Sequence, residues 1–224
     1  LVRIERLDGT TQVARLMPES PSLIVTEAPS GWQVVSLYFW IGVEHILLGV
    51  DHLLFVLGLL LLVDTTSALV KTISAFTIAH SITLALSVFS VIHVPDAPLN
   101  AMIALSILFL GPEVVRKWRG QSSFTIRHPW FVSFAFGLMH GIGFASGLSM
   151  TGIPHGEIPS ALLFFNLGVE AGQLAFVFVA IWVAMSLRTL EFDRAWWAKR
   201  IPAYVVGSLG AFWTIQRFVM LLSL

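Results

Sequence analysis

The sequence contains no cysteine and has few charged residues. Without thiols the chain has no disulfide framework, no thiolate metal site and no cysteine nucleophile. Asp, Glu, Lys and Arg together make up 12% of the 224 residues, about half the share of a soluble domain, whereas 56% of the residues are hydrophobic. The mean hydropathy of +0.84 agrees with this composition. We therefore expect an integral membrane protein.

A net basic charge is also missing, because 13 Lys and Arg residues are balanced by 13 Asp and Glu residues. A protein that binds nucleic acid usually offers a surplus of basic side chains to the phosphate backbone. The composition therefore predicts a lipid bilayer as partner and gives no reason to expect a nucleic acid.

Long apolar runs fill most of the chain, and six of them reach the roughly 20 residues that a transmembrane helix needs. Polar connections with Asp, Thr, Ser, Gly and Pro separate them, as is typical of helix ends. The predicted fold is an all-α membrane protein with a bundle of six transmembrane helices in residues 34–224. The predicted spans are Ser36–Val63, Ser67–Ile92, Ala97–Trp118, Trp130–Met150, Ile158–Leu187 and Ile201–Leu224.

The positions of Lys and Arg predict how this bundle is oriented. Nine of the 13 lie in or beside the first, third and fifth connections, three lie in the N-terminal segment, and the second and fourth connections contain none. Cytoplasmic loops carry the excess of basic residues in membrane proteins. We therefore expect the odd connections to be cytoplasmic and both termini to be extracytoplasmic.

The first 33 residues do not resemble a membrane span. Residues 2–7 alternate as a strand does, Asp8-Gly9 is a strong hairpin turn, and Thr11–Leu16 suits a returning strand. An isolated hairpin is barely stable, and the chain begins with Leu1 rather than Met. We interpret residues 1–33 as the end of a larger extracytoplasmic β domain and its linker, with a short disordered tail as the alternative.

Ionisable side chains inside the first predicted span point to a site, because such residues are costly in a membrane. Glu44 and Asp51 are seven residues apart, as are His45 and His52. Seven steps of about 100° return to within roughly 20° on a helix, so the four groups form adjacent stripes on one side. A single salt bridge with hydrogen-bonded histidines is the alternative, although one bridge does not need four groups.

Other spans supply partners for these groups. His80 and His140 lie deep in the second and fourth spans, and Asn166, Glu170 and Gln173 share one face of the fifth. A lone histidine at such depth is about as often a packing residue as a ligand, whereas several spans with polar groups at depth favour a shared site. Imidazole and carboxylate together suit Ni²⁺, Co²⁺ or Zn²⁺, and the lack of cysteine argues against Cu⁺.

The pattern His45, five residues, Asp51-His52 resembles the first motif of the HupE/UreJ family, in the longer branch with an N-terminal extracytoplasmic domain. The family's second motif, Phe-His-Gly-x-Ala-x-Gly-x-Glu, is matched only at His140 and Gly141, with Gly147 in the place of Glu. Glu170 can supply that carboxylate from a neighbouring helix. The resemblance covers roughly residues 30–224 and implies a nickel or cobalt permease of the bacterial inner membrane.

We therefore expect a transporter, rather than an enzyme, that moves a divalent transition metal through an intramembrane site. The ion is expected to be nickel, with cobalt or zinc as alternatives. Glu44 and Asn166 are expected to support the ligands or relay protons. The predicted ligands are His45, Asp51, His52, His80, His140 and Glu170.

Two other functions stay open from the sequence. Three histidines and a carboxylate can hold a Zn²⁺ that activates water, which would make the protein an intramembrane hydrolase. Alternatively, the polar cluster serves only for packing in a non-catalytic subunit or assembly factor of a membrane complex. A homo-oligomer and a membrane-complex partner are both compatible with the sequence.

Overall fold

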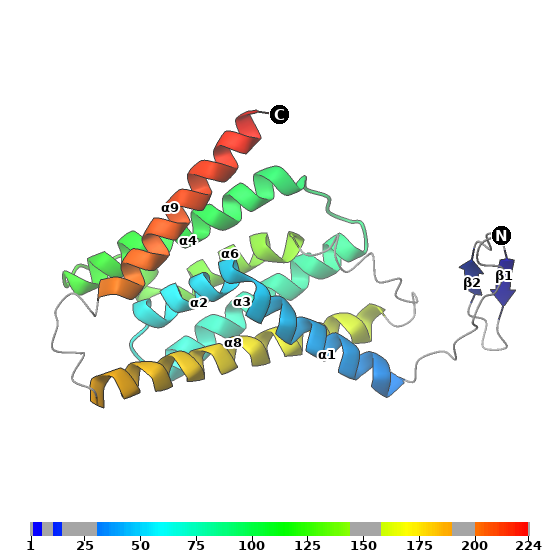
Figure 1. Cartoon of the computed structure of the whole chain (residues 1–224), viewed down its shortest axis with the longest axis horizontal. Helices are drawn as coiled ribbons and strands as arrows, with labels where there is room; N and C mark the ends of the chain where they lie inside the picture. Colours follow the sequence, from blue (N-terminus) through cyan, green and yellow to red (C-terminus); the bar gives the residue numbers. More distant parts are fainter. Residues whose placement is uncertain (1, 6–10, 15–30, 144–157, 190–199, 224) are drawn as a thin grey trace.

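A computed structural model of the protein describes residues 2–5, 11–14, 31–143, 158–189 and 200–223 (Figure 1). The described helices lie alongside or across one another, and the first of them is followed by a bend of 74°. Two strands precede the helices. The elements are β1 (Val2–Glu5), β2 (Thr11–Ala14), α1 (Gly31–Leu48), α2 (Val50–Leu62), α3 (Thr66–Val88), α4 (Asp96–Trp118), α5 (Phe124–Arg127), α6 (Pro129–Ile142), α8 (Ile158–Thr189) and α9 (Ile201–Leu222).

The two strands form the predicted hairpin. They pair antiparallel, with Val2 opposite Ala14 and Glu5 opposite Thr11. The predicted turn at Asp8-Gly9 lies outside the described residues. That the hairpin belongs to a larger extracytoplasmic β domain stays a prediction.

The helices have the length and apolarity of a multi-pass membrane domain. Four of them, α3, α4, α8 and α9, are each long and apolar enough to cross a membrane, and α1 with α2 makes a fifth if the bent pair is one span. Helix α6 is apolar but has only 14 residues. The span predicted at Trp130–Met150 continues beyond α6 into residues outside the described part, so the count of six spans stays a prediction.

The first predicted span is not one helix, which corrects the expectation from the sequence. It breaks at Gly49, whose φ of −79° and ψ of 88° are not helical, and α1 and α2 meet at 74°. A Cβ atom on this glycine would lie 2.7 Å from both the His45 carbonyl oxygen and the His52 ring. The bend therefore requires glycine at this position. A single glycine in an apolar run does not by itself predict a bend.

Three helix pairs make the most extensive packing: α3 with α6, α1 with α8, and α4 with α9. In the first pair, Gly137 and Gly141 bring α6 so close to α3 that a Cβ on either would collide with the backbone of Phe76 or His80. Such close approach is the usual function of small residues between membrane helices. It holds the end of α6 against the middle of α3.

Two apolar clusters lie at opposite ends of the helices, and the polar groups are found between them. One cluster combines Leu54–Leu62 with parts of α3, α4 and α9, and the other combines the first half of α1 with the start of α8. Along α3, Phe76 belongs to the first cluster, Leu84 belongs to the second, and His80 lies between them. The fold therefore places the intramembrane histidines in a layer between two apolar layers.

Candidate metal centre

The break at Gly49 brings together the two histidines of the first predicted span. Seven residues of straight helix span about 10 Å, yet the ring centroids of His45 and His52 are 4.7 Å apart. His45 lies in the last turn of α1 and His52 in the first turn of α2. The bend thus brings two histidines of one stripe into direct contact.

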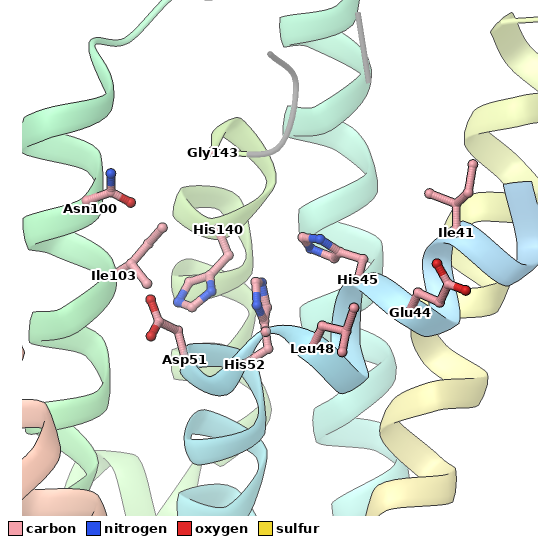
Figure 2. A pocket seen from close by; sticks show the side chains of 11 residues that line it. Ile41, Glu44, His45, Leu48, Asp51, His52, Asn100, Ile103, His140 and Gly143 are labelled. Carbon is pink, nitrogen blue, oxygen red and sulfur yellow. The ribbon is translucent and has the colours of Figure 1, made fainter. Parts of the chain in front are cut away.

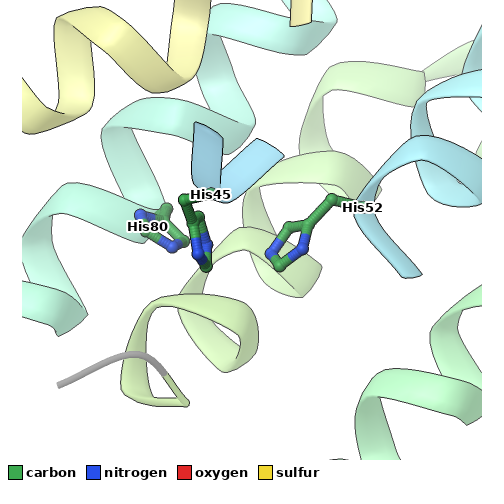
Figure 3. Close-up of side chains that lie close together, drawn as sticks. All are labelled: His45, His52 and His80. Atoms are coloured by element: carbon green, nitrogen blue, oxygen red, sulfur yellow. The ribbon is translucent and has the colours of Figure 1, made fainter. Parts of the chain in front are cut away.

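Helices α3 and α6 add the buried imidazoles of His80 and His140 to this cluster. Figure 3 shows His80 beside His45 and His52. The ring of His80 is 6.1 Å from that of His45 and 6.5 Å from that of His52, and His140 is 5.1 Å from His52. One nitrogen from each of His45, His52 and His80 lies within 4.8 Å of the others. Four predicted ligands, His45, His52, His80 and His140, therefore meet in one place.

A hydrogen bond to α8 orients the His80 ring. Asn166 donates its amide N–H to the Leu162 carbonyl at 2.7 Å, which leaves its Oδ1 to accept from His80 Nδ1 at 3.2 Å. His80 Nδ1 therefore carries the proton, and Nε2 keeps a free electron pair. Metal-binding histidines usually donate their second N–H in this way, so the contact is compatible with the supporting role expected for Asn166, which stays a prediction.

Ser106 of α4 orients His140 by the same logic. Its hydroxyl donates to the Ile103 carbonyl at 2.6 Å, so its oxygen can only accept from His140 Nε2, 3.0 Å away. The electron pair of His140 is therefore on Nδ1. Both Ser106 and His140 are almost fully buried, so water does not compete for this bond.

The remaining ring nitrogens are available to a ligand. Among the described residues, His52 Nδ1 and Nε2, His80 Nε2 and His140 Nδ1 are buried and have no hydrogen-bond partner. Buried polar atoms are rarely left unpaired, and neutral imidazoles with free electron pairs suit a transition-metal ion. Bonds of about 2.0 Å to one tetrahedral ion require nitrogens roughly 3.3 Å apart, so we expect the rings to move together when an ion binds.

A cavity of about 490 Å³ leads to the cluster (Figure 2). It is bounded by the end of α1, by Asn100 and Ile103 in the first turns of α4, and by the end of α6 at Gly143. Glu44 lines it and is exposed. The cavity therefore opens at the ends of α4 and α6 that the charge distribution predicts to be extracytoplasmic.

Asp51 lines the same cavity, but its carboxylate is paired with a cation. Arg217 of α9 donates from Nη2 to Asp51 Oδ2 at 2.7 Å and from Nη1 to the Asn100 carbonyl at 2.9 Å. The two charged side chains are 22% and 23% exposed. The ion pair neutralises Asp51 next to the histidines and fastens α9 to the break between α1 and α2.

Glu170 lies outside the cluster of ligand nitrogens. It accepts a hydrogen bond from Ser74 of α3 at 2.5 Å, and Ser74 is nearly two turns along the helix from His80. The next polar contact between α3 and α8 joins Thr77 to Gln173 at 3.0 Å. The face of Asn166, Glu170 and Gln173 therefore pairs with α3 along its length, and only Asn166 touches a histidine.

Aromatic rings close the cluster on the side away from the cavity. Phe55 and Phe76 are almost fully buried and have ring centroids 5.5 and 5.2 Å from that of His140. Phe76 also stacks on His80. These rings belong to the apolar cluster of α2, α3, α4 and α9, and they separate the histidines from the other end of the bundle.

Two residues that are not among the predicted ligands also contact the site. Ser106 lies alone in an apolar run and gives no signal of its own. Arg217 is an ionisable residue within the last apolar run, so the sequence predicts that it has a polar partner. The fold shows that this partner is Asp51.

A family model described as HupE / UreJ protein matches residues 21–217 of the chain. Comparison with curated proteins and with solved structures gives no match. The matched range includes every helix of the described part up to Arg217, so it contains the histidine cluster, the cavity and the ion pair.

Proposed function

Because the chain belongs to the HupE/UreJ family, which is associated with nickel and cobalt transport, we propose that it carries Ni²⁺ across the bacterial inner membrane through the histidine cluster. One observation supports this most. Four imidazoles from α1, α2, α3 and α6 meet beside a cavity, and three of them have buried nitrogens without a hydrogen-bond partner among the described residues. In this proposal the metal ion is the transported substrate.

The donor set favours a borderline transition metal over the common hard cations. Mg²⁺ and Ca²⁺ prefer oxygen ligands, whereas the cluster offers neutral nitrogens. Because these imidazoles bring no negative charge, the ion keeps its double positive charge unless a carboxylate joins them. Asp51 lines the cavity and can bind the ion once its carboxylate separates from Arg217. Breaking the Asp51–Arg217 ion pair is therefore part of metal binding in this proposal.

The two sides of the cluster suggest how the ion crosses. The cavity reaches the histidines from the predicted extracytoplasmic side, while Phe55 and Phe76 cover them on the opposite side. A transporter must not connect its site to both sides at once. We propose that this structure has the site facing outward and that passage inward requires these two rings to separate.

The test is metal binding and uptake by the purified protein, with His52→Ala as the main variant because His52 contacts His45, His80 and His140. We expect detergent-purified protein to retain nickel and proteoliposomes to accumulate it, and we expect His52→Ala to lose both by at least tenfold. His93→Ala is the matched control, since His93 is exposed in the connection before α4.

The same preparation separates the proposal from its rivals. Uptake that survives in His52→Ala would rule out the cluster as the route. Zinc held stoichiometrically without uptake, together with hydrolysis of an ester or amide, would instead indicate a metalloenzyme. Protein that folds, binds no metal and copurifies with a fixed partner would indicate a structural subunit.

A further inference from the structure

A second and larger cavity, of about 760 Å³, lies between α4 and α9, at the opposite end of these helices from the Asp51–Arg217 pair. Its polar end is formed by the last residues of α4 and the first of α9. Its deeper part is formed where the two helices meet, at Gly111 and Gly207. A Cβ on Gly111 would come within 2.9 Å of the Gly207 backbone, so the helices touch there.

Three arginines gather at the wide end of this cavity. Arg116 and Arg119 come from the end of α4, and Arg200 directly precedes α9. Arg116 is paired with Glu113 at 2.7 Å, although its side chain stays 55% exposed. Of the described residues that line the cavity, none is acidic. The residues that line this end of the cavity therefore include basic but no acidic side chains among those described.

The rest of the cavity is suited to hydrocarbon. Ala203, Gly207 and Ala211 of α9 face Leu108 and Val115 of α4 across it. Trp118 and Tyr204 flank the arginines, and both are exposed. Such aromatic residues concentrate at the membrane–water interface. Along the cavity, the apolar groove is followed by the aromatic residues and then by the arginines. A phospholipid in a membrane has the same order of acyl chain, interface and headgroup.

We propose that this cavity binds one anionic phospholipid, with its phosphate on Arg119 and Arg200 and an acyl chain along the α4–α9 groove. Arginine binds phosphate through two parallel N–H···O bonds, and basic pockets between transmembrane helices on the cytoplasmic side are known to hold anionic headgroups. The count of Lys and Arg predicts that this end of α4 and α9 is cytoplasmic. The proposal does not depend on metal transport.

A second copy of this chain could also occupy the groove, because α9 is largely exposed. Only 17% of the most apolar window of α9 is buried. In a symmetric dimer, however, the same patch faces itself, which would bring two sets of these arginines together. The positive charge therefore favours a lipid over a copy of the chain.

The experiment uses quenching of Trp118 fluorescence by brominated phospholipids. The full chain is reconstituted in vesicles of phosphatidylcholine with increasing brominated phosphatidylglycerol, or with brominated phosphatidylcholine alone. The signal of Trp118→Phe is subtracted to isolate this one tryptophan. We expect phosphatidylglycerol to quench Trp118 at a mole fraction about tenfold lower than phosphatidylcholine does.

Two variants locate the binding. Arg119→Gln with Arg200→Gln should weaken the preference for phosphatidylglycerol by about tenfold, which removes it, whereas Arg127→Gln removes an arginine outside the cavity and should leave it. If the double variant fails to fold, Ser208→Phe provides an independent test, because it fills the groove, leaves the arginines in place and adds no tryptophan. It should also remove the preference.

Three results would overturn the proposal: equal quenching by both lipids, an equal loss in Arg127→Gln, or displacement of phosphatidylglycerol by inorganic phosphate at a matching concentration. The last would assign the site to a free anion. The chain has no cysteine of its own, so Ser208→Cys also tests for a second copy. Disulfide-linked dimers formed by this variant in native membranes would show that the groove is a protein interface.

Discussion

Side chains that form hydrogen bonds with the histidines decide which nitrogen of each imidazole can bind an ion. Ser106 fixes His140, and Ser106→Ala removes the acceptor that keeps the proton on Nε2. We expect this change to weaken metal binding by about 10–100-fold, the usual effect of losing such a supporting contact, as measured by titration calorimetry. Ser133→Ala is the control, because Ser133 is equally buried and its hydroxyl has no partner among the described residues. An equal loss in both variants would assign the effect to packing.

Arg217 competes with the metal ion for Asp51. Arg217→Gln releases the carboxylate beside the histidines, so we expect nickel to bind about tenfold more tightly, or about 1.4 kcal/mol. Without nickel the same variant should be less stable by about 3 kcal/mol, because an unpaired charge is left in a partly buried place. Calorimetry and thermal unfolding measure the two effects.

The Asp51→Asn variant is the counterpart. It keeps the size of the side chain but removes the charge that a divalent ion needs, so nickel binding or uptake should fall at least tenfold. The double variant Asp51→Asn with Arg217→Gln should bind like Asp51→Asn and regain part of the lost stability. If nickel binding is unchanged in every one of these variants, Asp51 serves only to hold α9.

At the scale of one element, the bend between α1 and α2 is a requirement of the site. Gly49→Ala places a methyl group against the His52 ring and the His45 carbonyl. We expect a loss of about 1–3 kcal/mol of stability and at least a tenfold loss of nickel binding. Gly31→Ala at the start of α1 is the matched control, because a Cβ there meets nothing within 4 Å. Wild-type nickel binding by Gly49→Ala would show that the spacing of His45 and His52 is unimportant.

The same bend explains what the sequence could and could not predict about the site. A seven-residue repeat of His and carboxylate predicts that the groups share a side of the helix, and the depth of His80 and His140 predicts that they join. The 4.7 Å between His45 and His52 depends on the break, whose only signal is Gly49. The role of Glu170 as ligand also stays a prediction, and its contact with Ser74 depends on how α3 and α8 cross.

At the scale of the whole molecule, the expected orientation rests on nine basic residues against three. Alkaline phosphatase fused after Leu224 should be active, because that enzyme works only outside the cytoplasm, and the same enzyme inserted at Gln121–Ser123 should be inactive. The opposite pattern of activity would invert the orientation. It would also place the arginine-lined cavity of α4 and α9 outside, and direct the cavity of the histidines towards the cytoplasm.

The apolar runs predict most of the helical domain, because length and hydropathy alone decide whether a segment can cross a bilayer. The ends of α4 at Trp118 and of α9 near Leu222 agree with the predicted spans within two residues. Which helices pair is a different matter. Hydropathy does not distinguish one apolar neighbour from another, so the contact of α9 with the break, through Arg217, appears only in three dimensions.

The break at Gly49 has one more consequence, which concerns the peptide dipoles rather than any side chain. Because α1 ends at Leu48 beside the cavity, its last carbonyl groups bring the negative end of a helix dipole, equivalent to about half an elementary charge, to the entrance of the site. Residues Leu48 and Gly49 both line that cavity. Helix α2 begins at Val50 and brings the positive end of its own dipole to the same point, where Asp51 lies in its first turn. The break therefore sets two opposite helix ends side by side at the entrance of the site.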